Sequence, residues 1–423
     1  MYKPPHLTPA LEAAGAPPAT LPRAAIPFYQ PRISEEAILE VVSTLRSGWL
    51  TTGRKTKEFE EAFGKYLGLK HAVAVNSCTA ALHLALEALG LRSGQGVLVP
   101  TMTFAATAEV VRYFNATPIL VDCRPEDLNM DVLHARRQLA AARARGLEVP
   151  IIIPMHYGGQ IGDAAGLVEL AGDENLKVVE DAAHCCPARY RHGNDEPWLS
   201  VGSLSQVSCF SFYANKCITT GEGGMACTDD IQLADRMRIM SLHGISRDAW
   251  KRFTAEGSWF YEIAAPGFKY NLTDIASALG IHQLREADRF HAERRRVAET
   301  YTRFLSDIDE LELPREMPNR VHSWHLYAIR LRLERLAIDR ASFIAELKSR
   351  NIGTSVHWMP LHMHPYYRAT YEYEPEDFPI AVREYARIIS LPIFPDMTEE
   401  QIETVSDAIH DLIATNLRPG LHG

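Results

Sequence analysis

The chain has 423 residues, of which 46% are hydrophobic and 23% charged, a composition typical of globular proteins. Its formal net charge of −9 provides no electrostatic attraction to nucleic acid or to an anionic membrane, and no apolar run approaches membrane-spanning length. Seven cysteines, an odd number, do not indicate a disulfide framework, so we expect a protein of the reducing cytoplasm.

The length predicts one large domain and one smaller one. Residues 1–26 are rich in Pro and Ala without the apolar core of a secretory signal, and we predict a flexible arm. Residues 27–285 are predicted to form the large domain, because helix and strand patterns alternate there. Helices are expected at Ser34–Ser47, Thr56–Leu67, Ala80–Leu89, Thr107–Phe114, Asp131–Arg145 and Asp163–Ala171. Strands are expected at His71–Val75, Gly96–Pro100, Thr117–Asp122, Val149–Pro154 and Leu176–Glu180. This alternation predicts the α/β class, with a mainly parallel sheet covered on both faces.

Residues 286–423 follow a different pattern, which predicts a linking helix and a small α+β C-terminal domain. The helix expected at Ile281–Leu305 carries Arg294-Arg295-Arg296, which we interpret as a solvated face. Further strands are expected at Trp324–Leu333 and Gly353–Trp358. Further helices are expected at Arg340–Arg350, Phe378–Ile389 and Thr398–Leu417.

One lysine lies between a short apolar run and a glycine-rich turn. The sequence reads Phe210-Ser211-Phe212-Tyr213-Ala214-Asn215-Lys216, and Gly221-Glu222-Gly223-Gly224 follows. An amine held on a rigid loop can form a Schiff base with an aldehyde cofactor or a carbonyl substrate. Lys216 is therefore a candidate catalytic residue.

An acid, Asp181, ends an apolar strand and should lie at the carboxyl edge of the sheet, where open α/β sheets bind ligands. A lysine together with a strand-end acid is what pyridoxal 5′-phosphate (PLP) needs, because the acid pairs with the pyridinium nitrogen. Alone, a helix cap or a structural ion pair explains Asp181 equally well. His184 follows one turn later and could hydrogen-bond the phenolic oxygen of the cofactor.

A phosphate site is predicted where the strand before Ser77-Cys78-Thr79-Ala80 gives way to a helix. Free N–H groups and the helix dipole bind anions at such a start, and the Thr79 hydroxyl can add to them. An ordinary N-cap is the simpler interpretation of this motif alone. Ser211 could supply a second hydroxyl.

Phe104 follows the strand at Gly96–Pro100 and could stack on a flat cofactor, although a core position is the simpler interpretation. Two groups of side chains raise the alternative of a metal site: Asp181, His184, Cys185, Cys186 and His192, and then His357, His362 and His364. Neither group has the spacing of a paired Cys-x-x-Cys site or of a His-Glu-x-x-His helix, so we expect no metal.

The motifs, in their order along residues 26–417, resemble those of the DegT/DnrJ/StrS family of PLP-dependent nucleotide-sugar aminotransferases. The matching stretches are Ser47–Gly53, Asn76–Leu82, Glu180–His184, Ser211–Lys216, Gly221–Gly224 and Gly267–Ile275. The resemblance implies a fold-type I aminotransferase that uses L-glutamate as amino donor. It also implies a homodimer whose active sites lie at the subunit interface.

The same resemblance implies roles for individual residues. Lys216 would hold PLP covalently and shuttle the proton, Asp181 would pair with the ring nitrogen, and His184 would lie near the ring oxygen. Phosphate contacts would come from the turn containing Cys78, Thr79 and Ala80, from Ser211, and from Asn271 of the neighbouring subunit. Phe104 would be the stacking aromatic.

Two stretches, Lys269–Asp274 and Ile352–His357, are similar to members of the family that aminate C4 of a UDP-linked 4-keto sugar. We therefore expect that reaction, with Thr51, Thr52, His357 and His362 on the sugar side. The alternatives are a C3-aminating enzyme of the same family and a PLP-binding regulator without turnover. Lys216 argues against a dehydrating relative, because that group has histidine in place of the lysine.

Overall fold

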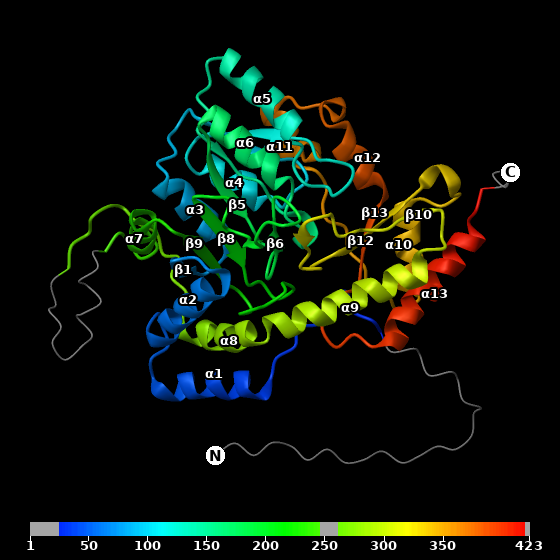
Figure 1. Cartoon of the computed structure of the whole chain (residues 1–423), viewed down its shortest axis with the longest axis horizontal. Helices are drawn as coiled ribbons and strands as arrows, with labels where there is room; N and C mark the ends of the chain where they lie inside the picture. The colour runs from blue at the N-terminus through cyan, green and yellow to red at the C-terminus, as the bar shows by residue number, and fades with distance from the viewer. Residues whose placement is uncertain (1–24, 246–260, 419–423) are drawn as a thin grey trace.

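The computed structural model describes residues 25–245 and 261–418 (Figure 1). The arm predicted at residues 1–26 lies, except for its last two residues, outside the described residues. Among the described residues, no helix is long and apolar enough to cross a membrane. A cytoplasmic location stays a prediction.

The described helices alternate with short strands along the first half of the chain. The helices are α1 (Glu35–Ser47), α2 (Arg54–Leu67), α3 (Cys78–Ala88), α4 (Ala106–Arg112), α5 (Val132–Ala144), α6 (Ala164–Glu174), α7 (Ile231–Met240), α8 (Asp274–Arg285), α9 (Ala287–Leu305), α10 (Arg340–Ser349), α11 (Pro365–Tyr371), α12 (Pro379–Arg387) and α13 (Glu399–Thr415). The strands of the central sheet are β1 (His71–Val75), β2 (Gly96–Pro100), β3 (Thr117–Val121), β4 (Ile151–Ile152), β5 (Lys177–Asp181), β8 (Val207–Ser211) and β9 (Gly224–Thr228).

The central sheet has the strand order β1-β9-β8-β5-β4-β2-β3. Strands β8, β5, β4, β2 and β3 pair in parallel, whereas β9 pairs antiparallel with both β1 and β8. In this described sheet β9 alone therefore runs against the other six strands. The predicted α/β class with a mainly parallel sheet is confirmed.

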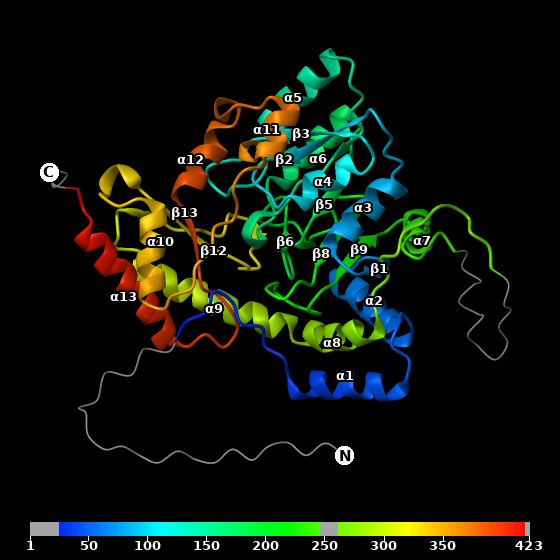
Figure 2. The same ribbon diagram turned by 180° about the vertical axis from the view of Figure 1, so that it is seen from behind.

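Alternating side chains of the strands enter the cores on the two faces of the sheet. Val97 and Val99 of β2 pack into a core with α3 and α4, whereas Leu98 between them packs into a core with α5 and α6. Residues of β1 divide in the same way between α3 and the pair α2 and α8. Helices thus cover both faces (Figures 1 and 2), because a strand buried on both sides exposes successive side chains to opposite layers.

A second sheet lies beside the first and has the order β10-β12-β13, with strands Leu311–Glu312, Tyr327–Leu331 and Ile388–Leu391. Its core includes residues of α9, α10 and α13. A third sheet joins β11 (Arg320–Val321), β6 (Arg189–Tyr190) and β7 (Leu199–Ser200). The predicted boundary at residues 285 and 286 coincides with the break between α8 and α9, but the division into two domains stays a prediction.

A predicted strand and a predicted helix end in the C-terminal part are wrong. Gly353–Trp358 does not form a strand; isolated bridges join Ser355 to Ser390 and, just before this stretch, Ile352 to Ile26. The helix predicted to reach Ile389 ends at Arg387, and Ile388–Leu391 instead pairs with β12 as strand β13. Pairing with β12 places these four residues in the interior, where all are buried.

The predicted helix Ile281–Leu305 is in fact two helices that meet at Glu286, α8 and α9. The interpretation of its arginine run as a solvated face is wrong for Arg294, which is buried. The Arg294 guanidinium donates to the carbonyls of Ile393 (2.9 Å) and Trp324 (3.4 Å), so it ties α9 to two segments of the C-terminal part.

The carboxylate of Asp274, at the start of α8, caps a different helix. Gly53, the N-cap of α2, makes no side-chain cap bond. Asp274 instead accepts bonds from the N–H groups of Gly53 (2.7 Å), Thr56 (2.9 Å) and Lys55 (3.2 Å) and from the Thr56 hydroxyl (2.8 Å). Because helix starts lack acceptors for their first N–H groups, this buried carboxylate fixes the Thr51–Gly53 turn against α8.

We predict that Asp274→Ala lowers the free energy of unfolding by about 3 kcal/mol, because buried donors lose a charged acceptor. Asp274→Asn should cost less, since three of the four bonds go to Oδ1, which an amide oxygen can replace. Thermal unfolding of the three proteins measures this, and equal midpoints for the wild type and Asp274→Ala would contradict it.

Candidate active site

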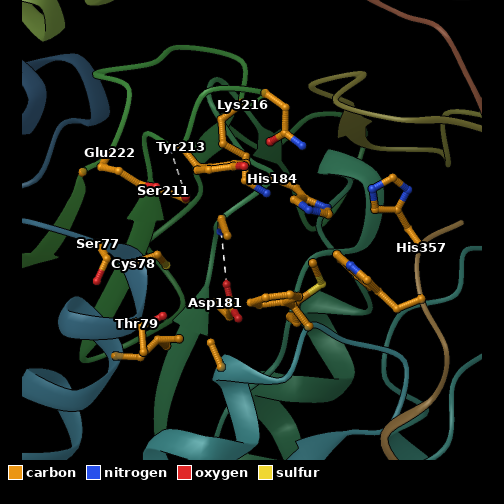
Figure 3. Close-up of a pocket in the computed structure, with 18 residues that line it drawn as sticks. Ser77, Cys78, Thr79, Asp181, His184, Ser211, Tyr213, Lys216, Glu222 and His357 are labelled. Atoms are coloured by element: carbon orange, nitrogen blue, oxygen red, sulfur yellow. Dashed lines mark hydrogen bonds between the residues drawn. The ribbon is translucent and has the colours of Figure 1, made fainter. Parts of the chain in front are cut away.

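The direction of the strands brings several functional side chains to one edge of the central sheet. The carboxyl ends of β1, β2, β5 and β8 meet there, and β9, which runs in the opposite direction, begins there at Gly224. A cavity of about 360 Å³ opens at this edge (Figure 3). Figure 3 shows Ser77, Cys78 and Thr79 at one end and His357 at the other, with Asp181 between them.

Lys216 lies on the loop that joins β8 to β9 and lines the cavity. The loop contains a tight turn at Lys216, whose N–H donates to the Tyr213 carbonyl (2.9 Å), and the Thr220 N–H donates to the Phe212 carbonyl (2.9 Å). Burial lowers the pKa of the Lys216 amine, and the nearby Cys78 and Asp181 oppose this only in part. The neutral amine, the form that attacks carbonyl carbon, is therefore favoured relative to a free lysine.

Asp181 is the last residue of β5 and is 4% exposed. Its Oδ2 accepts a bond from the Thr107 hydroxyl (2.7 Å), and its Oδ1 accepts one from the Ala183 N–H (3.2 Å). Burial raises the pKa of Asp181, whereas these two donors, Lys216 and His156 act in the opposite direction. The carboxylate lines the same cavity as Lys216.

His184 is buried, and its ring lies at 5.0 Å and 27° to the Trp358 ring. Burial, and then the charge of Lys216, lower the pKa of His184 well below its ordinary value, so the ring is neutral. Its Nδ1 accepts a bond from the Gly158 N–H (3.2 Å). A neutral ring that accepts at Nδ1 carries its proton on Nε2, so His184 can donate one hydrogen bond.

The other end of the cavity is the start of α3. Ser77 caps this helix by accepting a hydrogen bond from the Ala80 N–H (3.1 Å). The first two N–H groups of the helix are those of Cys78 and Thr79. Strand β9 lies so close that a Cβ on Gly224 would come within 2.4–2.6 Å of backbone atoms of Ser77 and Cys78. A glycine is therefore required to bring β9 against this turn, where an anion can bind.

Two further observations fit a flat, polar ligand in the cavity. The Asn215 Oδ1 atom is buried and has no hydrogen-bond partner among the described residues, which indicates that a ligand supplies the donor. Phe104 is 60% exposed and lines the cavity, so its simpler interpretation as a core residue is wrong. Ser211 lines the cavity near the start of α3, and its hydroxyl accepts a hydrogen bond from the Tyr213 N–H (3.3 Å).

The two histidines predicted on the sugar side occupy different places. His357 lines the cavity, its Nδ1 lies 2.9 Å from the Ser390 hydroxyl, and burial lowers the pKa of His357 to about 3, so the ring is neutral. His362 is 1% exposed and outside the cavity lining. Its Nδ1 bonds the Thr101 hydroxyl (2.7 Å), and its ring stacks on Phe378.

Four more predicted residues do not line the cavity of their own chain: Ala80, whose N–H donates to Ser77, and Thr51, Thr52 and Asn271. The Asn271 amide donates to the Thr52 hydroxyl (2.7 Å), which in turn donates to the Leu272 carbonyl. The Asp274 N–H donates to the Thr51 carbonyl (3.2 Å). We call Thr51, Thr52 and Asn271 the threonine–asparagine cluster.

Within residues 25–245 and 261–418, no group of three or more His, Cys, Asp or Glu side chains is arranged to hold a metal ion. The interpretation of Trp358 as part of a pocket wall fits its place in the cavity lining, whereas Met155, Tyr213, Asn215 and Glu222 also line the cavity and were not predicted. Tyr213, Asn215 and Glu222 lie close to Lys216 in the sequence. This closeness is the signal by which they could have been predicted to line the cavity.

The comparisons with known proteins agree with this geometry. The DegT/DnrJ/EryC1/StrS aminotransferase family matches residues 31–410. The spore coat polysaccharide biosynthesis protein SpsC of Bacillus subtilis is 40% identical over 389 residues, which are 92% of this chain and 97% of SpsC.

Solved structures show the same likeness. Spr1654 from Streptococcus pneumoniae, in its PMP form, is 29% identical with a TM-score of 0.84, covering 92% of this chain and 99% of that one. Its PLP form gives a TM-score of 0.83 at 28% identity. Helicobacter pylori PseC, an aminotransferase involved in the biosynthesis of pseudoaminic acid, is 26% identical with a TM-score of 0.81, covering 92% and 100% of the two chains.

A lysine and a carboxylate facing one cavity, on a fold shared with structures solved in PLP and PMP forms, lead to one conclusion. The chain belongs to the DegT/DnrJ/EryC1/StrS aminotransferase family and is a PLP-dependent sugar aminotransferase.

Proposed function

We propose that this enzyme transfers the amino group of L-glutamate to C4 of a UDP-linked 4-keto sugar. The observation that carries the proposal is that Lys216 and Asp181, 35 residues apart in sequence, line one cavity at the carboxyl edge of the sheet. The choice of C4 and of UDP is supported by the resemblance of Lys269–Asp274 and Ile352–His357 to C4-aminating members of the family.

The residues around the cavity fit PLP. Asp181 would hold the ring nitrogen, the Nε2–H of His184 would donate to the ring oxygen, and Phe104 would cover one face of the ring. The start of α3 at Cys78 and Thr79, together with Ser211, would hold the phosphate, whereas the Ala80 N–H already donates to Ser77. PLP, when bound, supplies an electron sink that stabilises negative charge on the carbon that carries the amino group.

Lys216 supplies two properties. Its neutral Nζ can bond to carbonyl carbon, and the same nitrogen can take a proton from the amine-bearing carbon and return it later. Both steps require an unprotonated amine, which the lowered pKa of Lys216 favours. The tight turn that holds Lys216 keeps this nitrogen in the cavity where Asp181 lies.

We also propose that the enzyme works as a homodimer. The threonine–asparagine cluster is outside the cavity of its own chain, yet the family resemblance assigns Asn271 to the phosphate of a neighbouring subunit. His357 lies at the end of the cavity opposite to the start of α3, where a sugar would lie, and Trp358 also lines the cavity. His357 would offer a neutral hydrogen-bonding ring there.

A screen of nucleotide-linked keto sugars with ¹⁵N-labelled L-glutamate tests the proposed reaction. We expect ¹⁵N to appear in a product of a UDP-4-keto sugar, with NMR placing the nitrogen on C4. Transfer to C3 would replace the proposal with the C3-aminating alternative. Bound cofactor without any ¹⁵N transfer from glutamate would instead favour a regulator without turnover.

We predict that Lys216→Ala abolishes covalent attachment of the cofactor and lowers turnover by a factor of about 10³ or more, because both the nucleophile and the proton carrier are lost. Lys216→Arg should fail similarly, since guanidinium stays protonated. Lys57→Ala, at an exposed lysine on α2, is the matched control. Full turnover by Lys216→Ala would refute the assignment.

We predict a distinctive pH dependence for Lys216 in cofactor-free protein. A lowered pKa means that the amine remains neutral, and reactive, at lower pH than an ordinary lysine. Treatment with PLP, reduction with borohydride and peptide mass spectrometry should show labelling of Lys216 before that of exposed Lys57. As the pH falls, labelling of Lys216 should persist further down; identical pH profiles for the two lysines would contradict this.

A further inference from the structure

The loop between β2 and α4 buries three hydroxyl groups beside the active site. Thr101 and Thr107 are 0% exposed and Thr103 is 1% exposed, whereas Phe104 in the same loop is 60% exposed and lines the cavity. A buried hydroxyl needs a hydrogen-bond partner, so each of these threonines identifies a contact that the loop must make.

Two of the hydroxyls form a chain that ends on Asp181. The Thr107 Oγ1 lies 2.7 Å from Asp181 Oδ2, and the Thr103 Oγ1 lies 2.7 Å from the Thr107 Oγ1. A carboxylate can only accept, so Thr107 gives its single proton to Asp181, and Thr103 must then donate to Thr107. Both hydroxyls are thereby oriented towards the carboxylate.

The Phe104 carbonyl lies 3.2 Å from the Thr107 Oγ1 and offers this hydroxyl a second acceptor. If Asp181 were protonated, its own O–H could donate to Thr107, and Thr107 would turn to the Phe104 carbonyl. The orientation of the chain therefore depends on the charge of Asp181.

The beginning of the loop is fixed from the C-terminal part of the chain. The Leu361 N–H donates to the Thr101 carbonyl (2.9 Å), and the Thr101 hydroxyl bonds His362 Nδ1 (2.7 Å). His362 therefore acts on the loop and not on the cavity. The loop is held at both ends, by His362 at Thr101 and by Asp181 at Thr107.

We propose that Thr107, supported by Thr103, is a positioning residue that holds one oxygen of Asp181 from behind and leaves the rest of the carboxylate facing the cavity. The role of that carboxylate towards the cofactor ring rests on the proposed function. The contact itself is a property of the protein without cofactor, so it can be tested separately.

The charge of Asp181 is the measurable consequence. Burial raises the pKa of Asp181, and the Thr107 hydroxyl is the largest influence in the opposite direction. The titratable groups that face Asp181 from the surrounding elements are Lys216, His156, Cys78, Cys185 and Cys209. None of these groups is changed by a substitution at position 107 or 103, so a shift would report the loss of the hydroxyl.

The test compares Thr107→Val, which keeps the shape and removes the hydroxyl, with Thr107→Ser, which keeps the hydroxyl. In cofactor-free protein labelled with ¹³C at Asp carboxyls, Thr107→Val should raise the pKa of Asp181 by about one unit. Asp181→Asn identifies the signal. Thr103→Val should give a smaller shift in the same direction, because it weakens the chain without breaking the last bond.

Binding of PLP, measured by equilibrium dialysis, is the second readout. Thr107→Val should weaken it about tenfold, because the carboxylate loses a hydrogen bond that holds it in place, and Thr107→Ser should restore it. Thr44→Val is the matched control, because that buried hydroxyl on α1 bonds only the Glu40 carbonyl (2.9 Å) among the described residues.

An unchanged pKa of Asp181 in Thr107→Val, or equal losses in Thr107→Ser and Thr107→Val, would overturn the proposal. Should Thr107→Val fail to fold, an unshifted Asp181 in Thr103→Val would overturn it as well. Full turnover by Asp181→Asn would instead refute the role of Asp181 in the proposed function, while the titrations of the threonine variants would still be decisive for the positioning contact.

Discussion

The direction of the strands in the central sheet decides where every functional group lies. Parallel strands end at the same edge, so residues that follow β1, β2, β5 and β8 converge although up to 139 residues separate Ser77 from Lys216. The reversed strand β9 brings Gly224 to this edge, and only a glycine allows the approach to Ser77.

Burial acts in opposite directions on the two central groups. It raises the pKa of Asp181 and lowers that of Lys216, so both are pushed towards their neutral forms. In the proposed roles the amine would need this effect, whereas the carboxylate would have to resist it to pair with a protonated ring nitrogen. The hydrogen bonds from Thr107 and Ala183 are made only to Asp181 and lower its pKa, so they favour an ionised acid beside a neutral amine.

Much of this arrangement could be predicted from the sequence, and the limits have physical causes. Helix and strand patterns that alternate along the first half of the chain predict the elements of the central sheet. The order of the motifs identifies Lys216 and Asp181 as candidate site residues. The strand Ile388–Leu391 continues directly from a helix without a breaking residue, so its pairing with β12 is decided by tertiary contacts. Arg294 is buried for a similar reason, because its acceptors are carbonyls 30 and 99 residues away. The contact of Thr107 with Asp181 spans 74 residues and has no local pattern.

The charges around the cavity have a consequence for assembly. Among the described residues, the cavity lining contains one lysine and no arginine. That lysine, Lys216, is the proposed nucleophile and proton carrier. Of the proposed substrates, glutamate carries two carboxylates and a nucleotide sugar carries a diphosphate, so these anions would need cations or N–H donors from elsewhere. The exposed Lys269 lies beside the threonine–asparagine cluster and donates to Asn271 (2.6 Å).

In a shared site, such a cluster would meet the anions of the opposite subunit. Its precise hydrogen bonding, anchored through Thr52 and the Asp274 cap, has no evident use in its own chain's cavity. A site divided between two chains would need such a cluster, whose polar groups are already held in place before they meet the ligand of the other subunit. Preorganisation of this kind lowers the entropic cost of binding. Substrate binding and dimer formation would stabilise one another, since each subunit would supply groups that the cavity of the other subunit lacks.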